Sequence, residues 1–213
     1  MASKNNTVKK DFDMVSESEV LNLIQEAKKP EKERKFTQAL ELYIVLKDID
    51  VKKGFALNEV IELPKQMTQP AAICVMATGD MSLKAKNAKA DQVIDNDELD
   101  TLAGNKRESR KLINKYDFFL ADTKLMPVVG KSLGQLLGPR GKMPTPVPFN
   151  APIESFLERF RHSIRVRLKN SLSLSCKFGD VTMDDNDLAS NAMAVINTIE
   201  KKLPNGGKNF KEF

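Results

Sequence analysis

Three cations alternate with apolar residues near the end of the chain. The run from 164 to 169 places Arg165, Arg167 and Lys169 at every second position, with aliphatic residues between them. A strand of this period points the cations to one face and packs the aliphatic side chains on the other. Like charges crowded on one face repel one another. The pattern therefore favours an anionic partner, such as a phosphate backbone, over a solvated sheet surface.

A second candidate site is the segment 34–38, at the start of an alternating run that predicts a strand over 35–47. It combines two cations, an aromatic ring, a hydroxyl and an amide: Arg34, Lys35, Phe36, Thr37 and Gln38. Phenylalanine is more often a core residue. At a strand end beside two cations, the ring of Phe36 can instead pack on a ribose or a base.

The net charge of the chain is modest but unevenly distributed. The 213 residues include 34 Lys and Arg against 29 Asp and Glu, a formal charge of +5 with a pI of about 9.1. Basic residues gather in three runs, at 28–35, 105–142 and 159–169. Such clustering suits phosphate binding. For the middle run, a solvated helix face explains the pattern equally well.

The sequence disfavours metal and cofactor chemistry. Cys74 and Cys176 lie far apart in apolar runs, which indicates buried, reduced thiols. His162 is the only histidine and stands among arginines, so neither a His-rich metal site nor a Ser-His-Asp triad is expected. Gly130-Lys131-Ser132 lacks the earlier glycine of a phosphate-binding loop, and no G-x-G-x-x-G is present. We expect no metal and no cofactor.

Membrane insertion is not expected either. The longest apolar runs are only a few residues, against about 20 for a membrane helix. Residues 1–13 are polar and do not resemble a signal sequence. These features indicate a soluble, intracellular protein.

Two styles of secondary structure alternate along the chain. The outer segments combine helices with alternating strands: a capping box at Ser16 and Glu19 predicts a first helix, and the runs 164–169 and 171–178 predict an antiparallel hairpin. In the middle, short fully apolar strands alternate with helices, which indicates a parallel sheet covered on both faces.

We therefore predict an α+β split domain built from both chain ends, with an inserted α/β Rossmann-like three-layer domain. Residues 1–66 and 156–213 form the first domain in this prediction, and residues 67–155 form the second. Four prolines between 144 and 152 predict an extended connector at one boundary.

Glycines and cations also gather beside that boundary. The loop consists of Gly138, Pro139, Arg140, Gly141 and Lys142. It has the G-x-x-G spacing of a KH module, but the following prolines prevent the second helix that such a module needs. A turn after a helix is the simpler interpretation. The combination of glycine and charge nevertheless suggests a close approach of the backbone to something.

Three of these segments together resemble one known family. Lys-Phe-Thr-Gln at 35–38, Leu-Lys-Asp-Ile-Asp at 46–50 and Leu-Gly-Pro-Arg-Gly-Lys-Met-Pro at 137–144 are similar to the ribosomal protein L-one family of the large subunit, in its archaeal-type branch. The resemblance implies the split architecture and binding to large-subunit ribosomal RNA at the mobile side stalk. It also implies contact with exit-site tRNA, assistance in its release, and translational repression through the protein's own mRNA.

Carried over by position, the resemblance implies an RNA surface at 34–38, with the basic strand residues Arg165, Arg167 and Lys169 on or near it. The loop 138–142 matches the hinge-side signature of the family. It further implies a monomer within the cytoplasmic ribosome that is not an enzyme. The alternative is a Rossmann-like enzyme acting on a nucleotide or nucleic acid, for which only Thr78, Asp80 and Asp122 follow the parallel strands.

One departure from the family stands near the C-terminus. Members normally close with a strand that carries Thr-Met-Gly, whereas Thr182-Met183 is followed by Asp184 and precedes the last predicted helix. From this difference we expect the sequence to be truncated before its final strand.

Overall fold

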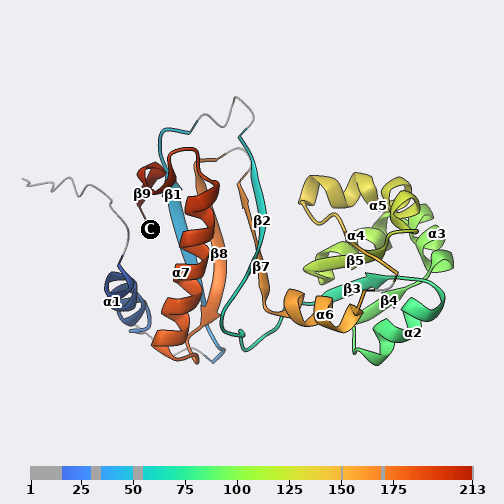
Figure 1. Cartoon of the computed structure of the whole chain (residues 1–213), viewed down its shortest axis with the longest axis horizontal. Coiled ribbons are helices and arrows are strands. Elements are labelled where there is room, and N and C mark those ends of the chain that lie inside the picture. Colours follow the sequence, from blue (N-terminus) through green and yellow to red (C-terminus); the bar gives the residue numbers. More distant parts are fainter. Residues whose placement is uncertain (1–15, 30–34, 50–54, 150, 169–170, 213) are drawn as a thin grey trace, which may run out of the picture. The chain divides into compact units, whose positions relative to one another are not determined.

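The computed structural model describes residues 16–29, 35–49, 55–149, 151–168 and 171–212 (Figure 1). The chain divides into two compact units. Unit 1 comprises residues 1–57 and 166–213, and unit 2 comprises residues 58–165. Both boundaries fall inside strands that pair with each other, β2 (Leu57–Glu62) and β7 (Ser163–Leu168). The helix at 153–161 packs into the core of unit 2.

Unit 1 is built on a three-stranded antiparallel sheet of order β8-β1-β9. Its strands are β1 (Ala39–Leu46), β8 (Ser173–Asp180) and the short β9 (Phe210–Glu212), which follows a 3-10 turn at Gly206–Asn209. The long helix α7 (Asp185–Lys202) packs on β8, and α1 (Glu17–Ala27) packs on α7 (Figure 1).

Local signals in the sequence explain two of these elements. The Oγ of Ser16 accepts a hydrogen bond from the N–H of Glu19, whose carboxylate accepts one from the N–H of Ser16, so the predicted capping box is confirmed. In β1, Leu40, Ile44 and Leu46 are buried as the alternation predicts, while Glu41 and Tyr43 are exposed.

The predicted hairpin between the last two long strands is wrong for the residues described. β7 pairs with β2, and β8 pairs with β1 in antiparallel register. Strands that are neighbours in sequence usually pair, but here each strand has its partner in the N-terminal part of the chain.

Unit 2 is a three-layer α/β/α arrangement, as predicted for the middle of the chain. Its four parallel strands have the order β4-β3-β5-β6 and are β3 (Ile73–Met76), β4 (Gln92–Ile94), β5 (Phe118–Asp122) and β6 (Thr145–Val147). The first part of the proline-rich connector is thus extended, as expected, and joins the sheet edge as β6.

Helices cover both faces of this sheet (Figure 1). One core contains residues of α2 (Gly79–Asn87) and α6 (Ile153–Arg161), packed on alternate residues of the central strands. The other core contains residues of α3 (Asn96–Gly104), α4 (Lys106–Lys115) and α5 (Met126–Arg140). The two sets interleave along β3 and β5, which explains why these strands are apolar throughout.

Both cysteines are free and buried in the two units. Burial raises the pKa of the Cys74 thiol to about 12, so the thiol stays protonated at neutral pH. The described residues contain no helix long and apolar enough to cross a membrane.

Candidate nucleic-acid interface

The segment 35–38 is an exposed lead into β1. Lys35, Phe36 and Thr37 are exposed and Gln38 is half-buried, while Arg34 lies outside the described residues. The side chain of Phe36 keeps 66% of its surface open, which is unusual for phenylalanine. An exposed ring next to a cation is the arrangement that base stacking with phosphate contact requires.

Backbone contacts fix this segment beside the turn that follows β8. The carbonyl of Gln38 accepts a hydrogen bond from the N–H of Val181, at 3.0 Å. In the turn, the buried carboxylate of Asp180 accepts hydrogen bonds from the N–H and the hydroxyl of Thr182. The predicted interface residues 35–38 therefore lead into a strand whose start is held by a structured turn.

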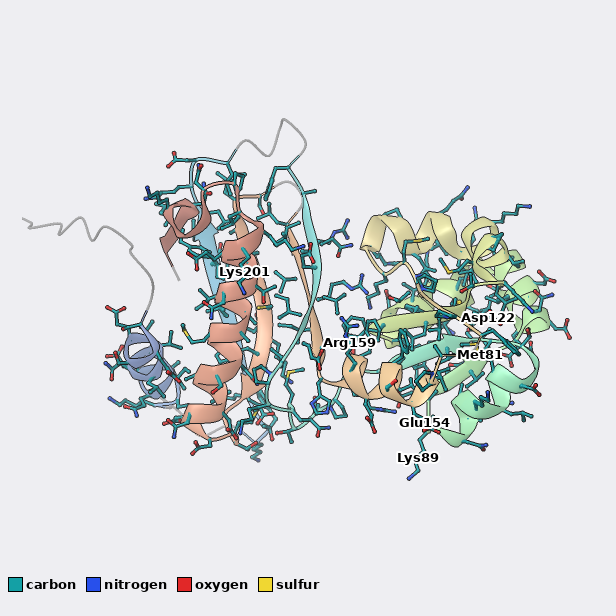
Figure 2. All side chains as sticks on the ribbon, viewed as in Figure 1. Met81, Lys89, Asp122, Glu154, Arg159 and Lys201 are labelled. Atoms are coloured by element: carbon teal, nitrogen blue, oxygen red, sulfur yellow. The ribbon has the colours of Figure 1, made fainter. Side chains whose placement is uncertain are left out.

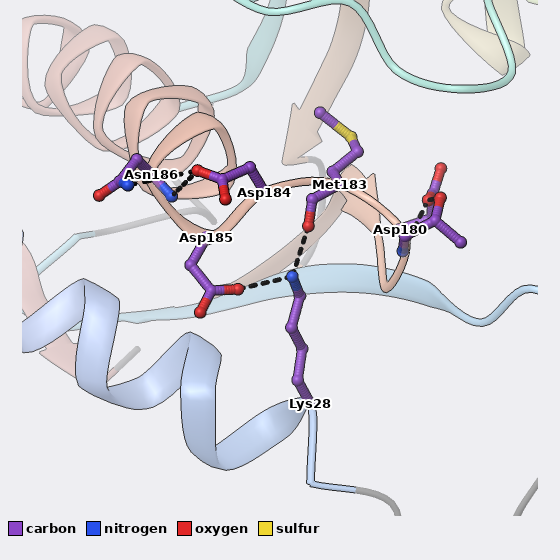
Figure 3. Close-up of polar contacts among 7 residues, drawn as sticks. Lys28, Asp180, Met183, Asp184, Asp185 and Asn186 are labelled. Atoms are coloured by element: carbon purple, nitrogen blue, oxygen red, sulfur yellow. Dashed lines mark hydrogen bonds and ion pairs between the residues drawn. The ribbon is translucent and has the colours of Figure 1, made fainter.

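Lys28 supplies a second brace in unit 1, at the end of α1 (Figure 3). Its ammonium donates to the carbonyl of Met183 and lies 2.6 Å from Oδ1 of Asp185. Asp185 stands in the first turn of α7, where the helix dipole favours a carboxylate. This cation of the first basic run therefore joins two helices.

One aromatic residue of the sheet of unit 1 is exposed to solvent. Tyr43 keeps 55% of its surface open and lies opposite Ser175 on β8. Two residues earlier on β1, Glu41 lies opposite Lys177 of β8. This exposure agrees with the strand alternation, which placed Tyr43 on the outer face.

The basic strand is only partly an open surface. Along β7, Arg165 and Arg167 are half-buried and alternate with buried aliphatic residues, while Lys169 lies outside the described residues. The guanidinium of Arg165 donates to the carbonyl of Gly141 and lies 5.2 Å from the centre of the Phe118 ring. Arg165 therefore positions the 138–142 loop within unit 2, which the alternation alone did not reveal.

The 138–142 loop is the end of α5, closed by a left-handed glycine. Gly141 has φ +68°, its N–H donates to the carbonyl of Gly138, and the N–H of Lys142 donates to that of Leu137. These two bonds form a Schellman cap, whose left-handed position favours glycine because it has no Cβ. The sequence motif thus forms the C-terminal cap of α5, after which the chain turns sharply into β6.

Lys142 extends the same construction to a second helix. Its Nζ donates to the carbonyls of Ile113, at 3.1 Å, and Tyr116, at 2.6 Å, which are orphan acceptors at the end of α4. Burial lowers the pKa of Lys142; Asp117 opposes this, and Arg165 and Arg140 add to it. The strand cation Arg165 and the loop cation Lys142 thus both serve the fold of unit 2.

Lys142 gives unit 2 a pH-dependent stability. Because the pKa of Lys142 is lower in the folded protein, the unfolded chain binds more protons between that pKa and 10.5, and the free energy of unfolding rises with pH in this window. We expect the Tm of the parent minus that of Lys142→Met to grow toward pH 10.5, by a few degrees at most because the ammonium is partly solvated.

Thermal unfolding followed by circular dichroism at several pH values measures this difference. The exposed Lys131→Met on α5 is the control, and its Tm should follow that of the parent. A parent-to-Lys142→Met difference that stays constant with pH would contradict the assignment.

The residues proposed for an enzyme do not form a reaction site. Asp122 is buried and its Oδ1 accepts a hydrogen bond from the N–H of Lys124, at 3.1 Å. Thr78 and Asp80 are exposed at the start of α2. Among the described residues, no group of three or more His, Cys, Asp and Glu side chains is arranged to hold a metal ion.

Comparisons with known proteins agree on one family. Residues 24–213 match the model of the Ribosomal protein L1p/L10e family. The chain is 67% identical over 199 residues to a Large ribosomal subunit protein uL1 of Cenarchaeum symbiosum, covering 93% of this chain and 92% of that protein. Proteins of the same name from Thermofilum pendens and Methanothermobacter thermautotrophicus are 47% and 39% identical, covering 81% and 92% of this chain and 78% and 92% of their own lengths.

Proposed function

Because the chain belongs to the Ribosomal protein L1p/L10e family, we propose that it binds large-subunit ribosomal RNA through unit 1, at residues 35–38. Membership makes it a structural protein of the large ribosomal subunit, as its archaeal uL1 relatives are, and excludes the enzyme alternative. The proposal also takes unit 1 as the RNA-binding split domain and unit 2 as the inserted domain, in the cytoplasmic ribosome.

The observation that carries this proposal is the exposed ring of Phe36 beside Lys35. A phenylalanine that is 66% exposed stabilises nothing in the core, whereas stacking on an unpaired base would bury its ring. The ammonium of Lys35 is then available for a neighbouring phosphate. Sequence-specific RNA recognition usually combines these two contacts.

The basic strand contributes in two ways in this proposal. Arg167 is half-buried and lies on the face of β7 opposite to its buried aliphatic residues, and it contacts RNA directly. Arg165 acts indirectly, because its guanidinium already holds Gly141. Arg34 and Lys169 remain predicted RNA contacts outside the described residues.

The finer functions rest on the same surface. We place the RNA target at the mobile side stalk, where the protein also contacts exit-site tRNA and assists its release. Repression of the protein's own mRNA follows if that mRNA presents the same unpaired bases. In that case rRNA and mRNA compete for residues 35–38.

A footprint of the protein on large-subunit rRNA tests the proposal. We expect protection confined to the side stalk, and we expect a transcript of the protein's own mRNA leader to remove that protection in competition. An unrelated transcript of equal length is the control for the competition. Absence of protection, or protection elsewhere on the rRNA, would overturn the RNA assignment.

A further inference from the structure

One side of α4 is almost entirely cationic. The helix buries Ser109 and Ile113 and exposes five basic side chains. These are Lys106, Arg107, Arg110, Lys111 and Lys115. With 3.6 residues per turn, positions 106 and 110 lie in one row along the helix surface, and positions 107 and 111 lie in a parallel row. The two members of each row are about one turn, or about 5.4 Å, apart along the helix axis.

The first three of these cations are not neutralised within the fold. Lys111 pairs with Glu108 at 2.9 Å, and Lys115 lies 5.2 Å from the centre of the Tyr116 ring. Among the described residues, Lys106, Arg107 and Arg110 have no carboxylate within 4.0 Å. Their positive charge is therefore open to an external anion.

Two acidic residues of the neighbouring helix α3 share a hollow with the other two cations of α4. Asp97 and Glu98 of α3 line a hollow of about 590 Å³. Its α4 wall includes Lys111 and Lys115 but not the first three cations. The surface of α4 is therefore polarised, with unneutralised charge near its N-terminal end.

This charge does not help the helix. Lys106 and Arg107 occupy the first turn of α4, where the positive end of the helix dipole favours acidic residues. The N–H groups of Arg107 and Glu108 are already satisfied by the side chain of Asn105. Since the cations oppose local helix stability, their presence points to a function outside the fold.

We propose that Lys106, Arg107 and Arg110 form a second RNA contact, which binds the phosphate backbone without reading bases. None of the exposed large hydrophobic side chains of the described residues lies on α4, so the helix offers no stacking ring for a base and no aromatic anchor for a protein partner. Its apolar side is in the core, so it cannot insert into a lipid surface. The inference rests on the proposed rRNA binding and adds unit 2 to it.

The test compares the triple variant Lys106→Gln, Arg107→Gln, Arg110→Gln with the parent in filter binding to a large-subunit rRNA transcript at several salt concentrations. We expect affinity to fall about tenfold or more, and the slope of log K against log salt to lose roughly two to three units. An unrelated RNA should lose affinity to a similar extent. The Tm should not fall, because the removed charges oppose the helix dipole.

The matched control removes the same charge from another helix of unit 2. It carries Lys84→Gln, Lys86→Gln and Lys89→Gln at exposed positions on and after α2, and Lys89 points away from the ribbon in Figure 2. The control should bind as the parent does. If the triple variant binds like the parent, or the control loses as much affinity, the second contact is overturned while the proposed function stands. A parent that does not bind rRNA overturns both.

Discussion

Replacing Phe36 by alanine is expected to weaken binding to the side-stalk rRNA by roughly 5- to 150-fold. Stacking of one base on an aromatic side chain contributes about 1–3 kcal/mol, and this ring is open to solvent in the free protein. Because the ring carries no charge, the salt dependence of binding should not change. Filter binding of the variant to a side-stalk transcript measures both quantities.

Two companion variants separate stacking from loss of apolar surface. Phe36→Tyr keeps a ring and should retain most of the affinity. Leu23→Ala removes an apolar side chain that is 52% exposed on α1, and it should bind as the parent does. Parent-like affinity of Phe36→Ala, at unchanged Tm, would exclude this ring from the interface.

Replacing Gly179 by alanine is expected to destabilise unit 1 by about 3 kcal/mol. The added Cβ would overlap the side chain of Leu188, which is fully buried in the first turns of α7, and would lie 3.1 Å from the sulfur of Met183. Gly179 also borders a β-bulge, where the register between β1 and β8 shifts. The helix therefore packs directly on the strand backbone.

Thermal unfolding measures this effect, and a loss of roughly 10 °C or more in the transition of unit 1 is expected. Gly130→Ala on α5 is the control. Its Cβ would meet nothing within 4 Å, so this change should stabilise its helix by about 0.5–1 kcal/mol. Equal Tm values for Gly179→Ala and the parent would show that Leu188 repacks freely.

Much of the fold could be predicted because its signals are local. The capping box at Ser16 needs only residues 16–19, and the alternation of β1 needs only one strand. In unit 2, strands with two apolar faces and helices between them identify the layers without any knowledge of contacts. The order of these elements is also favoured by the handedness and shortness of α/β connections.

Partner choice between strands could not be predicted in this way. β8 has polar residues on one face and apolar residues on the other, which suits pairing with β7 or with β1 equally well. Only the packing of the whole unit decides between them, and it selects β1, more than a hundred residues earlier.

The candidate site shows the same limit at the level of single side chains. The sequence marked Arg165 as one cation of a basic strand and Lys142 as part of a glycine-rich loop, but it did not indicate the acceptors that they reach. Both find backbone carbonyls inside unit 2, at Gly141 for Arg165 and at the end of α4 for Lys142. The exposure of Phe36 was difficult to predict for a different reason: phenylalanine is usually buried, whereas the structure exposes this residue.

The interruption of unit 1 by unit 2 sets an order of events during synthesis. Every native partner within unit 2 lies between residues 58 and 165, so this unit can fold as soon as it leaves the ribosome. β1 waits for β8, and pairing across such a separation is slow. Prior folding of unit 2 brings β2 and β7 together and shortens the loop that β1 and β8 must close. In a nascent chain, unit 2 is therefore folded well before the turn after β8 forms and binds the backbone of residues 35–38.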